Sequence, residues 1–116
     1  LNGHHDLMRS AIENVLRNAV RFTKAGSAVA VSLVREHRDA LITIQDRGPG
    51  VPEAELARIF EPFYRVAESR DRDSGGTGIG LAITARVVGL YQGEVRAQNA
   101  ANGGLRVEIR LPLRRE

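Results

Sequence analysis

The sequence has no cysteine and no tryptophan, and it has few other aromatic residues. Without cysteine, a chain of 116 residues can form neither disulfides nor thiolate metal sites. With two tyrosines and three phenylalanines, its core must be mainly aliphatic. No stretch approaches the roughly 18 unbroken apolar residues of a membrane span, and no signal-peptide pattern opens the chain. These absences favour a globular domain without membrane contact, and the lack of cysteine fits a reducing compartment.

The charge of the chain is mildly positive. Seventeen Lys and Arg against 14 Asp and Glu give a formal net charge of +3. Such a balance suits a polyanionic ligand, either nucleotide phosphates or a nucleic acid. Aromatic residues are sparse and no basic stretch is clustered, which counts against a nucleic-acid module. We therefore do not expect a nucleic acid as partner.

Hydrophobic periodicity predicts an alternation of helices and strands. Apolar residues at helical spacing predict a helix over residues 7–22, with Asp6 as its N-cap, and a second long helix over 79–90. Alternating apolar residues predict strands over 28–34, 40–45, 94–99 and 105–111, and a short helix begins near Pro52. This order predicts an α+β fold, a two-layer sandwich in which helices cover one face of a mixed sheet. Without repeats or linkers, residues 1–116 are expected to form one domain.

A polar stripe runs along the first predicted helix. At about 100° per residue, Asn14, Asn18 and Arg21 fall within about 60° of one another, and Phe22 lies at the edge of the stripe. We expect this stripe to face away from the apolar core. Solvent-facing helix sides often carry such residues, yet two asparagines one turn apart serve no helical purpose. A side-chain carbonyl oxygen suits Mg²⁺, which takes phosphate oxygens and waters as its other ligands, and Arg21 would then reach a phosphate.

The loop that begins at Asp46 directly follows a predicted strand. A carboxylate at a strand end can accept a hydrogen bond from an exocyclic amine such as that of adenine. Gly48 and Gly50 would allow the backbone to approach a flat ring or to turn sharply. Asp and Gly are also ordinary turn residues, so this pattern indicates a nucleotide site only in combination with the motifs later in the chain.

Residues 75–80 hold four glycines and open the second long helix. Free backbone N–H groups and the positive end of the helix dipole make such a helix start an anion site. A dinucleotide fingerprint would have to follow a strand directly, whereas a charged segment over residues 67–76 precedes this one. That segment has almost nothing to bury, and we interpret it as a mobile lid.

Four segments in this order resemble the motifs of one family. Residues 13–19 resemble an N box, 46–50 a G1 box, 59–65 an F box and 76–83 a G2 box. The chain thus resembles, over almost its whole length, the ATP-binding catalytic domain of sensor histidine kinases, within the wider group that includes gyrase, Hsp90 and MutL. The resemblance implies a Bergerat-type ATP-binding fold. The lid sequence is most similar to Cpx-type envelope-stress sensor kinases.

The resemblance also implies residue roles. Asn18 would ligate Mg²⁺ with help from Asn14, Arg21 would contact phosphate, and Phe22 would pack on the nucleotide. Asp46 would bind the adenine amine, in a base pocket shaped by Gly48 and Gly50. Terminal phosphates would be contacted by Arg65, Arg70 and Arg72, with Asn18 and Arg65 as the catalytic pair. The lid hinge and phosphate cradle would comprise Gly76, Thr77, Gly78, Ile79, Gly80 and Leu81.

The activity implied is transfer of the γ-phosphate of ATP to a histidine on the dimerisation helices of the same two-component sensor kinase. A response regulator would be an indirect partner. The parent protein would sit in the bacterial inner membrane with this domain at its cytoplasmic face, and the isolated domain would be monomeric. His4, His5 and His37 lack the helical context of a phosphorylated histidine, so the acceptor is expected outside this chain.

A hydrolase of the same wider group, or a protein-serine kinase, would use the same nucleotide site. Hydrolytic relatives place a general-base glutamate four residues before the magnesium asparagine. That position is Asn14 here, and an amide cannot take a proton from water. Glu13 is adjacent but points about 100° away around the helix. The sequence therefore favours a kinase over a hydrolase, and both alternatives stay open to experiment.

Overall fold

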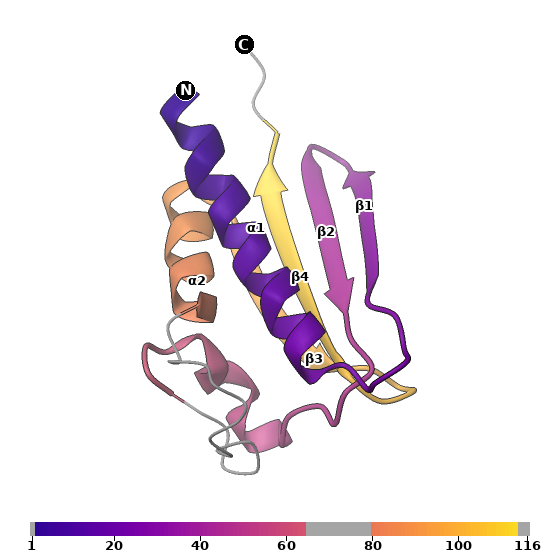
Figure 1. Ribbon diagram of the computed structural model, residues 1–116. Coiled ribbons are helices and arrows are strands. Elements are labelled where there is room, and N and C mark those ends of the chain that lie inside the picture. The colour runs from indigo at the N-terminus through magenta and orange to yellow at the C-terminus, as the bar shows by residue number, and fades with distance from the viewer. Residues whose placement is uncertain (1, 65–79, 114–116) are drawn as a thin grey trace.

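A four-stranded sheet with helices on one face makes up the part of the chain described by this computed structural model, residues 2–64 and 80–113 (Figure 1). The elements are α1 (Asn2–Phe22), β1 (Ala30–Glu36), β2 (Asp39–Gln45), the 3-10 helix η1 (Glu53–Phe60), α2 (Gly80–Leu90), β3 (Glu94–Asn99) and β4 (Leu105–Pro112). In Figure 1, α1 and α2 lie side by side against the sheet. The predicted α+β class, with helices on one face of the sheet, is confirmed.

Helix α1 starts earlier than its sequence suggested. It begins at Asn2, so Asp6 lies inside the helix and the predicted N-cap is wrong. A proline before Asp6 could have stopped the helix from extending, but none occurs there. His4 and His5 consequently belong to the first turns of α1 rather than to a preceding segment. No helix within residues 2–64 and 80–113 has both the length and the apolar character to cross a membrane.

The strand order corrects one detail of the predicted sheet. The order is β1-β2-β4-β3, and all three neighbouring pairs are antiparallel, so the described sheet is not mixed. Strands β2 and β3 do run parallel, but β4 lies between them, with Val107 opposite Ile44 on one side and Ala97 on the other. The tight connection after β3 makes β4 the antiparallel neighbour of β3, and the other edge of β4 pairs with β2.

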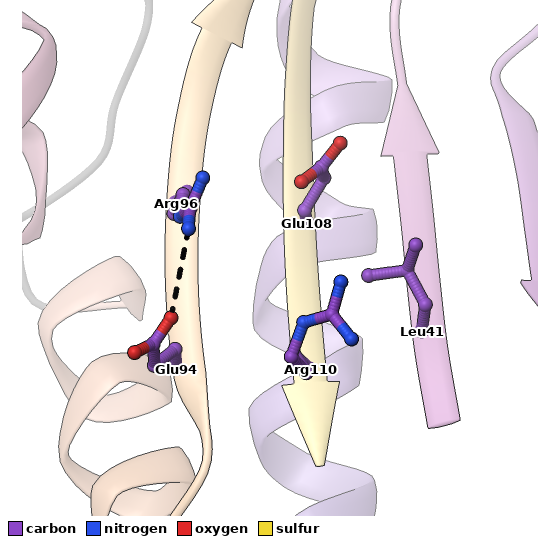
Figure 2. A pocket seen from close by; sticks show the side chains of 5 residues that line it. All are labelled: Leu41, Glu94, Arg96, Glu108 and Arg110. Carbon is purple, nitrogen blue, oxygen red and sulfur yellow. Dashed lines mark ion pairs between the residues drawn. The ribbon is translucent and has the colours of Figure 1, made fainter. Parts of the chain in front are cut away.

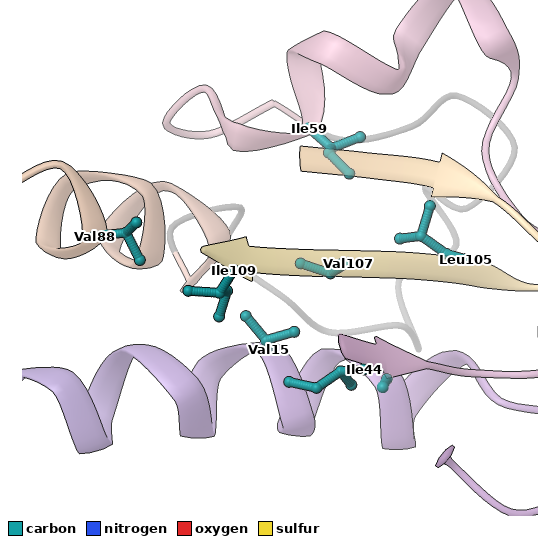
Figure 3. Close-up of a cluster of buried hydrophobic side chains, with 8 residues drawn as sticks. Val15, Ile44, Ile59, Val88, Leu105, Val107 and Ile109 are labelled. Carbon is teal, nitrogen blue, oxygen red and sulfur yellow. The ribbon is translucent and has the colours of Figure 1, made fainter. Parts of the chain in front are cut away.

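The core lies between the helices and β4 (Figure 3). Along β4 the residues alternate, so Leu105, Val107 and Ile109 are buried while the intervening residues face the other side. Helix α1 contributes a row at i, i+4 spacing, of which Val15 is almost completely buried. The fully buried Thr84 of α2 donates its hydroxyl hydrogen to the carbonyl of residue 11 in α1 at 2.7 Å, which ties the two helices together.

The face of the sheet turned away from α1 is charged (Figure 2). A shallow depression there is lined by Leu41, Glu94, Arg96, Glu108 and Arg110. Cross-strand neighbours carry opposite charges, since Glu94 lies opposite Arg110 and Arg96 opposite Glu108. Opposite-charge neighbours favour this pairing over a slipped register. The ion pair on this face between Arg96 and Glu94, at 3.8 Å, is exposed and contributes little stability.

Arg110 joins β4 to the β1–β2 hairpin. Its guanidinium donates to Glu36 at 3.0 Å and to Asp39 at 3.1 Å. These two hydrogen bonds, first that to Glu36 and then that to Asp39, raise the pKa of Arg110 above its already high usual value. The side chain therefore stays charged. Its two hydrogen bonds connect β4 to the end of β1 and the start of β2.

Candidate functional site

The Asp46 carboxylate is buried and held by backbone amides. Asp46 directly follows β2 and is only 3% exposed. Its Oδ1 atom accepts from the amide of Gly48 at 2.8 Å and from that of Leu105 at 3.0 Å. Its own amide donates to the Leu105 carbonyl at 3.0 Å. Both its own loop and the start of β4 thus orient the carboxylate before any ligand arrives.

Two glycines let the Asp46 loop pack closely between α1 and β4. A Cβ atom at Gly48 would lie 2.2 Å from the carbonyl oxygen of Phe22, the last residue of α1. A Cβ atom at Gly104 would lie 1.9 Å from the carbonyl oxygen of Asp46, and Gly104 has φ +95°. A larger residue at either position would push the loop away from its neighbours. Gly48 was predicted to shape a base pocket. The structure gives a packing reason for this glycine, namely its close approach to Phe22.

The end of α1 is tied to the same loop. The Arg47 amide donates to Oγ1 of Thr23 at 2.9 Å, and the Lys24 amide donates to the Arg47 carbonyl at 3.2 Å. As a result Phe22, half-buried at the end of the polar stripe, lies against the loop that carries Asp46. Two predicted site segments that are distant in sequence are thus brought together.

The polar stripe of α1 borders the core instead of facing away from it. Asn14 and Asn18 are both half-buried, whereas Arg21 is exposed. The expectation that the stripe faces away from the core is therefore wrong for the two asparagines. The reason is α2, which packs along that side: a Cβ atom at Gly80 would lie 3.7 Å from the Asn14 side chain. Arg17 also donates to Oδ1 of Asn14 at 3.4 Å.

The N-terminus of α2 meets this stripe. Within the described residues α2 begins at Gly80, and this first turn lies next to Asn14. Such a helix start attracts anions through its amides and dipole. Leu81 packs against the core, which leaves its backbone rather than its side chain for a ligand. The other predicted residues of this region lie outside the described residues, namely Arg65, Arg70, Arg72, Gly76, Thr77, Gly78 and Ile79, together with the predicted lid.

The segment after η1 carries two aromatic residues, of which Phe63 is exposed and Tyr64 contacts η1. The Tyr64 hydroxyl donates to the Glu55 carboxylate, and Arg58 lies 4.7 Å from the centre of the Tyr64 ring. The hydrogen bond to Glu55, then burial and the charge of Glu55, raise the pKa of Tyr64. Phe60 packs against the core, whereas Phe63 is 70% exposed and has φ +66°.

Sequence reasoning missed one residue of the site entirely and understood another only in part. Asn99, the last residue of β3, makes two hydrogen bonds to the backbone of Val51 in the Asp46 loop. No local signal could have found it, because its partner is 48 residues away. Gly104 follows Asn102 and Gly103 in a sequence typical of a hairpin turn, but its contact with Asp46 depends on the strand order.

The chain is similar to known proteins over nearly its whole length. Residues 3–115 match the family described as "Histidine kinase-, DNA gyrase B-, and HSP90-like ATPase". The chain is 42% identical over 113 residues to sensor histidine kinase CpxA of Escherichia coli strain K12, covering 97% of this chain and 24% of CpxA. It is 35% identical over 114 residues to the signal transduction histidine-protein kinase BaeS of the same strain, covering 98% and 24%. The chain thus spans about a quarter of the length of these curated relatives.

Solved structures give the same result. The mycobacterial sensor histidine kinase MprB has a TM-score of 0.83 and 36% identity, and the match covers 92% of this chain and 72% of that one. Full-length ShkA in complex with AMPPNP has a TM-score of 0.76 and 30% identity, over 91% of this chain and 21% of that one. The similarity therefore extends over nearly all of the chain in both sequence and fold.

Proposed function

The chain belongs to the histidine kinase-, DNA gyrase B- and HSP90-like ATPase family, and on this basis we propose that it binds ATP with Mg²⁺ and donates the γ-phosphate to a histidine. That histidine lies outside these 116 residues, on the dimerisation helices of the same two-component sensor kinase. The names of CpxA, BaeS and MprB as histidine kinases support this proposal, as does the complex of ShkA with AMPPNP, an ATP analogue.

One observation carries the proposal: α1 contacts both other segments of the site, because its end lies against the loop after β2 and Asn14, about two turns earlier, lies beside the start of the described part of α2. The loop supplies a buried, pre-oriented carboxylate in Asp46. Helix α1 supplies the half-buried side-chain amides of Asn14 and Asn18, and the described part of α2 begins beside Asn14, where its backbone amides would bind phosphate. A candidate base-binding acceptor therefore lies at the end of α1, and a candidate anion-binding helix start lies about two turns earlier along the same helix.

The adenine end of the nucleotide would be held by Asp46. Of its two carboxylate oxygens, only Oδ1 accepts hydrogen bonds from the described residues, and both come from backbone amides. We assign its other oxygen to the exocyclic amine of adenine. Gly48 and Gly50 have no side chain and would let the backbone approach the adenine ring. Phe22, which lies against this loop, would pack on the nucleotide.

The phosphate end would be held by α1 and α2. The described residues contain no group of three or more His, Cys, Asp or Glu side chains that could hold a metal by themselves. Mg²⁺ in nucleotide sites needs only one or two protein oxygens, because phosphates and waters complete its shell. The half-buried amide of Asn18 fits that requirement, with Asn14 beside it and Arg21 reaching a phosphate. Arg65, Arg70, Arg72 and the G2 residues keep the roles that the resemblance implies.

Phosphoryl transfer demands positioning and charge stabilisation more than covalent help from the protein. The bound Mg²⁺ would neutralise phosphate charge. Arg65 and the α2 N-terminus would stabilise the charge that develops on the transferred group. Asn14 cannot accept a proton from water, so the site lacks a hydrolytic base at that position. The acceptor imidazole, supplied from outside the chain, acts as the nucleophile.

The remaining proposals concern the whole protein. The partners would be its own dimerisation helices and, through the phosphorylated histidine, a response regulator. The parent protein would be an inner-membrane sensor with this domain at the cytoplasmic face, and the isolated domain would be monomeric.

Transfer can be tested with γ-labelled ATP, Mg²⁺ and a histidine-bearing dimerisation domain of a sensor kinase, mixed with this chain. We expect label on the dimerisation domain that is lost in acid and retained in base, as for phosphohistidine. The chain alone should release phosphate only at background rate. Rapid phosphate release by the chain alone would favour the hydrolase instead, and acid-stable label on an added protein would favour the serine kinase.

A variant of Asn18 tests the metal role. Asn18→Ala removes the proposed magnesium ligand, so we expect the gain in ATP affinity from Mg²⁺ to fall on the order of tenfold or more. Affinity in EDTA should change little. Calorimetric titrations with Mg²⁺ and with EDTA measure both. Glu13→Ala, on the exposed side of the same helix, is the matched control and should leave both affinities unchanged. An equal loss with and without Mg²⁺ in Asn18→Ala would argue against metal ligation.

A further inference from the structure

We propose that Asn99 is a positioning residue that sets the geometry of the base pocket, an inference that rests on the proposed ATP-binding function. Its Oδ1 accepts from the Val51 amide at 2.9 Å, and its Nδ2 donates to the Val51 carbonyl at 2.7 Å. The side chain thereby pairs with the Val51 backbone in both directions, as a neighbouring strand would. Asparagine suits this task because its short side chain carries both a donor and an acceptor.

This pair of bonds holds the far end of the loop that carries Asp46. At its near end, the loop is held by Leu105, whose amide donates to Asp46 and whose carbonyl accepts from it. At its far end it is held by Asn99. Gly50 lies between, with φ +78°, and a Cβ atom there would lie 2.7 Å from Oδ1 of Asn99. The positive φ favours glycine at this position, and the Asn99 side chain lies close beside it.

Both anchors belong to the β3–β4 hairpin. Asn99 ends β3 and Leu105 begins β4, and the Ala100 amide donates to the Gly104 carbonyl at 2.9 Å between them. The hairpin thus holds the loop through Leu105 and through Asn99. The distance between these two residues restricts the conformation of the segment from Asp46 to Val51. Adenine recognition by Asp46 consequently depends on a residue that need not touch the nucleotide.

The role is distinct from a general contribution to folding. Asn99 is exposed, and both of its hydrogen bonds are at the surface. When the side chain is removed, water can satisfy the Val51 amide and carbonyl, so the fold should survive. What is lost is the restriction on the loop, and with it the alignment of Asp46 with the base.

The test compares Asn99→Ala and Asn99→Asp with the control Gln98→Ala. Gln98 precedes Asn99 on β3, and its side-chain amide contacts Glu108 on the open face of the sheet. Calorimetry in EDTA gives affinities for ATP, GTP and inorganic tripolyphosphate, and thermal unfolding reports stability. GTP is the informative competitor because guanine carries a carbonyl oxygen where adenine carries its amine, so Asp46 cannot accept from it.

We expect Asn99→Ala to weaken ATP binding by about three- to tenfold, from the loss of two neutral hydrogen bonds. Affinities for GTP and tripolyphosphate should hardly change, so the preference for ATP falls by the same factor. Asn99→Asp retains the acceptor but sets a carboxylate oxygen against the Val51 carbonyl, so it should give a loss at least as large. Gln98→Ala should match the wild type throughout.

Several results would overturn the inference. Equal losses for ATP, GTP and tripolyphosphate in Asn99→Ala, or a lower melting temperature without a change in ATP preference, would leave Asn99 a merely structural residue. If the Ala variant does not fold, an unchanged ATP preference in Asn99→Asp would have the same meaning. A wild-type chain without preference for ATP would instead overturn the proposed function, and the role of Asn99 with it.

Discussion

Asp46→Asn should lower the affinity for ATP about ten- to a hundredfold while leaving the domain folded. A hydrogen bond to a charged group contributes about 1.5–3 kcal/mol, and each 1.4 kcal/mol corresponds to a factor of about ten in affinity. The backbone amides of Gly48 and Leu105 both donate to Oδ1 of Asp46, so the amide oxygen of the asparagine must take that place. Its NH₂ group then faces the adenine amine, and two donors oppose each other.

Calorimetric titration with ATP measures this loss, and urea unfolding checks that the fold is kept. Asp39→Asn is the matched control, because it makes the same substitution at the opposite end of β2. Asp39 contacts Arg110 on the charged side of the sheet, away from the Asp46 loop. The control should leave ATP affinity as in the wild type. Unchanged ATP affinity in Asp46→Asn would rule out the adenine role.

Gly104→Ala should be the most destabilising small substitution near the site, with a loss of roughly 2–5 kcal/mol in the free energy of unfolding. Two costs combine. A side chain at φ +95° is strained, and the new methyl group would lie 1.9 Å from the carbonyl oxygen of Asp46. The Asp46 loop or the β3–β4 hairpin must then move. A loss of this size is a large part of the roughly 5–15 kcal/mol that typically stabilises a domain.

Gly103→Ala separates the two costs. Gly103 has a similar φ of +99°, but no atom lies within 4 Å of a Cβ added there. Its replacement should therefore show the backbone strain alone, about 1–2 kcal/mol. Urea unfolding of both variants gives the difference, which measures the clash with Asp46. Equal losses in the two variants would contradict the close packing of β4 against the loop.

Local pattern was sufficient to predict most of the helices and strands. Apolar spacing places α1 and α2 because each helix buries one side against the same layer, and alternation identifies β4 because every second residue enters the core. The start of α1 was missed because Asp6 is a good N-cap in isolation, although the helix continues through it. Helix ends depend on small free energies, so local signals locate them poorly.

The site likewise has features that one segment predicts and features that depend on contacts between segments. Asn14 and Asn18 were recognised as a pair because helical geometry alone places them on one face. The sequence did not predict what this face of α1 contacts, because that depends on where α2 packs. Asp46 was recognised from its place after a strand, but its two backbone donors were not, since one of them belongs to β4.

The sequence by itself determined the α+β class, the order of the elements and the residues predicted to bind the nucleotide, because these depend on periodicities and short motifs within single segments. Only the tertiary structure decided that β4 separates β2 from β3, that the asparagines border the core, and that Asn99 and Gly104 hold the Asp46 loop. The physical reason is range: these features join residues from separate elements, and packing free energy selects them after local propensities have been satisfied.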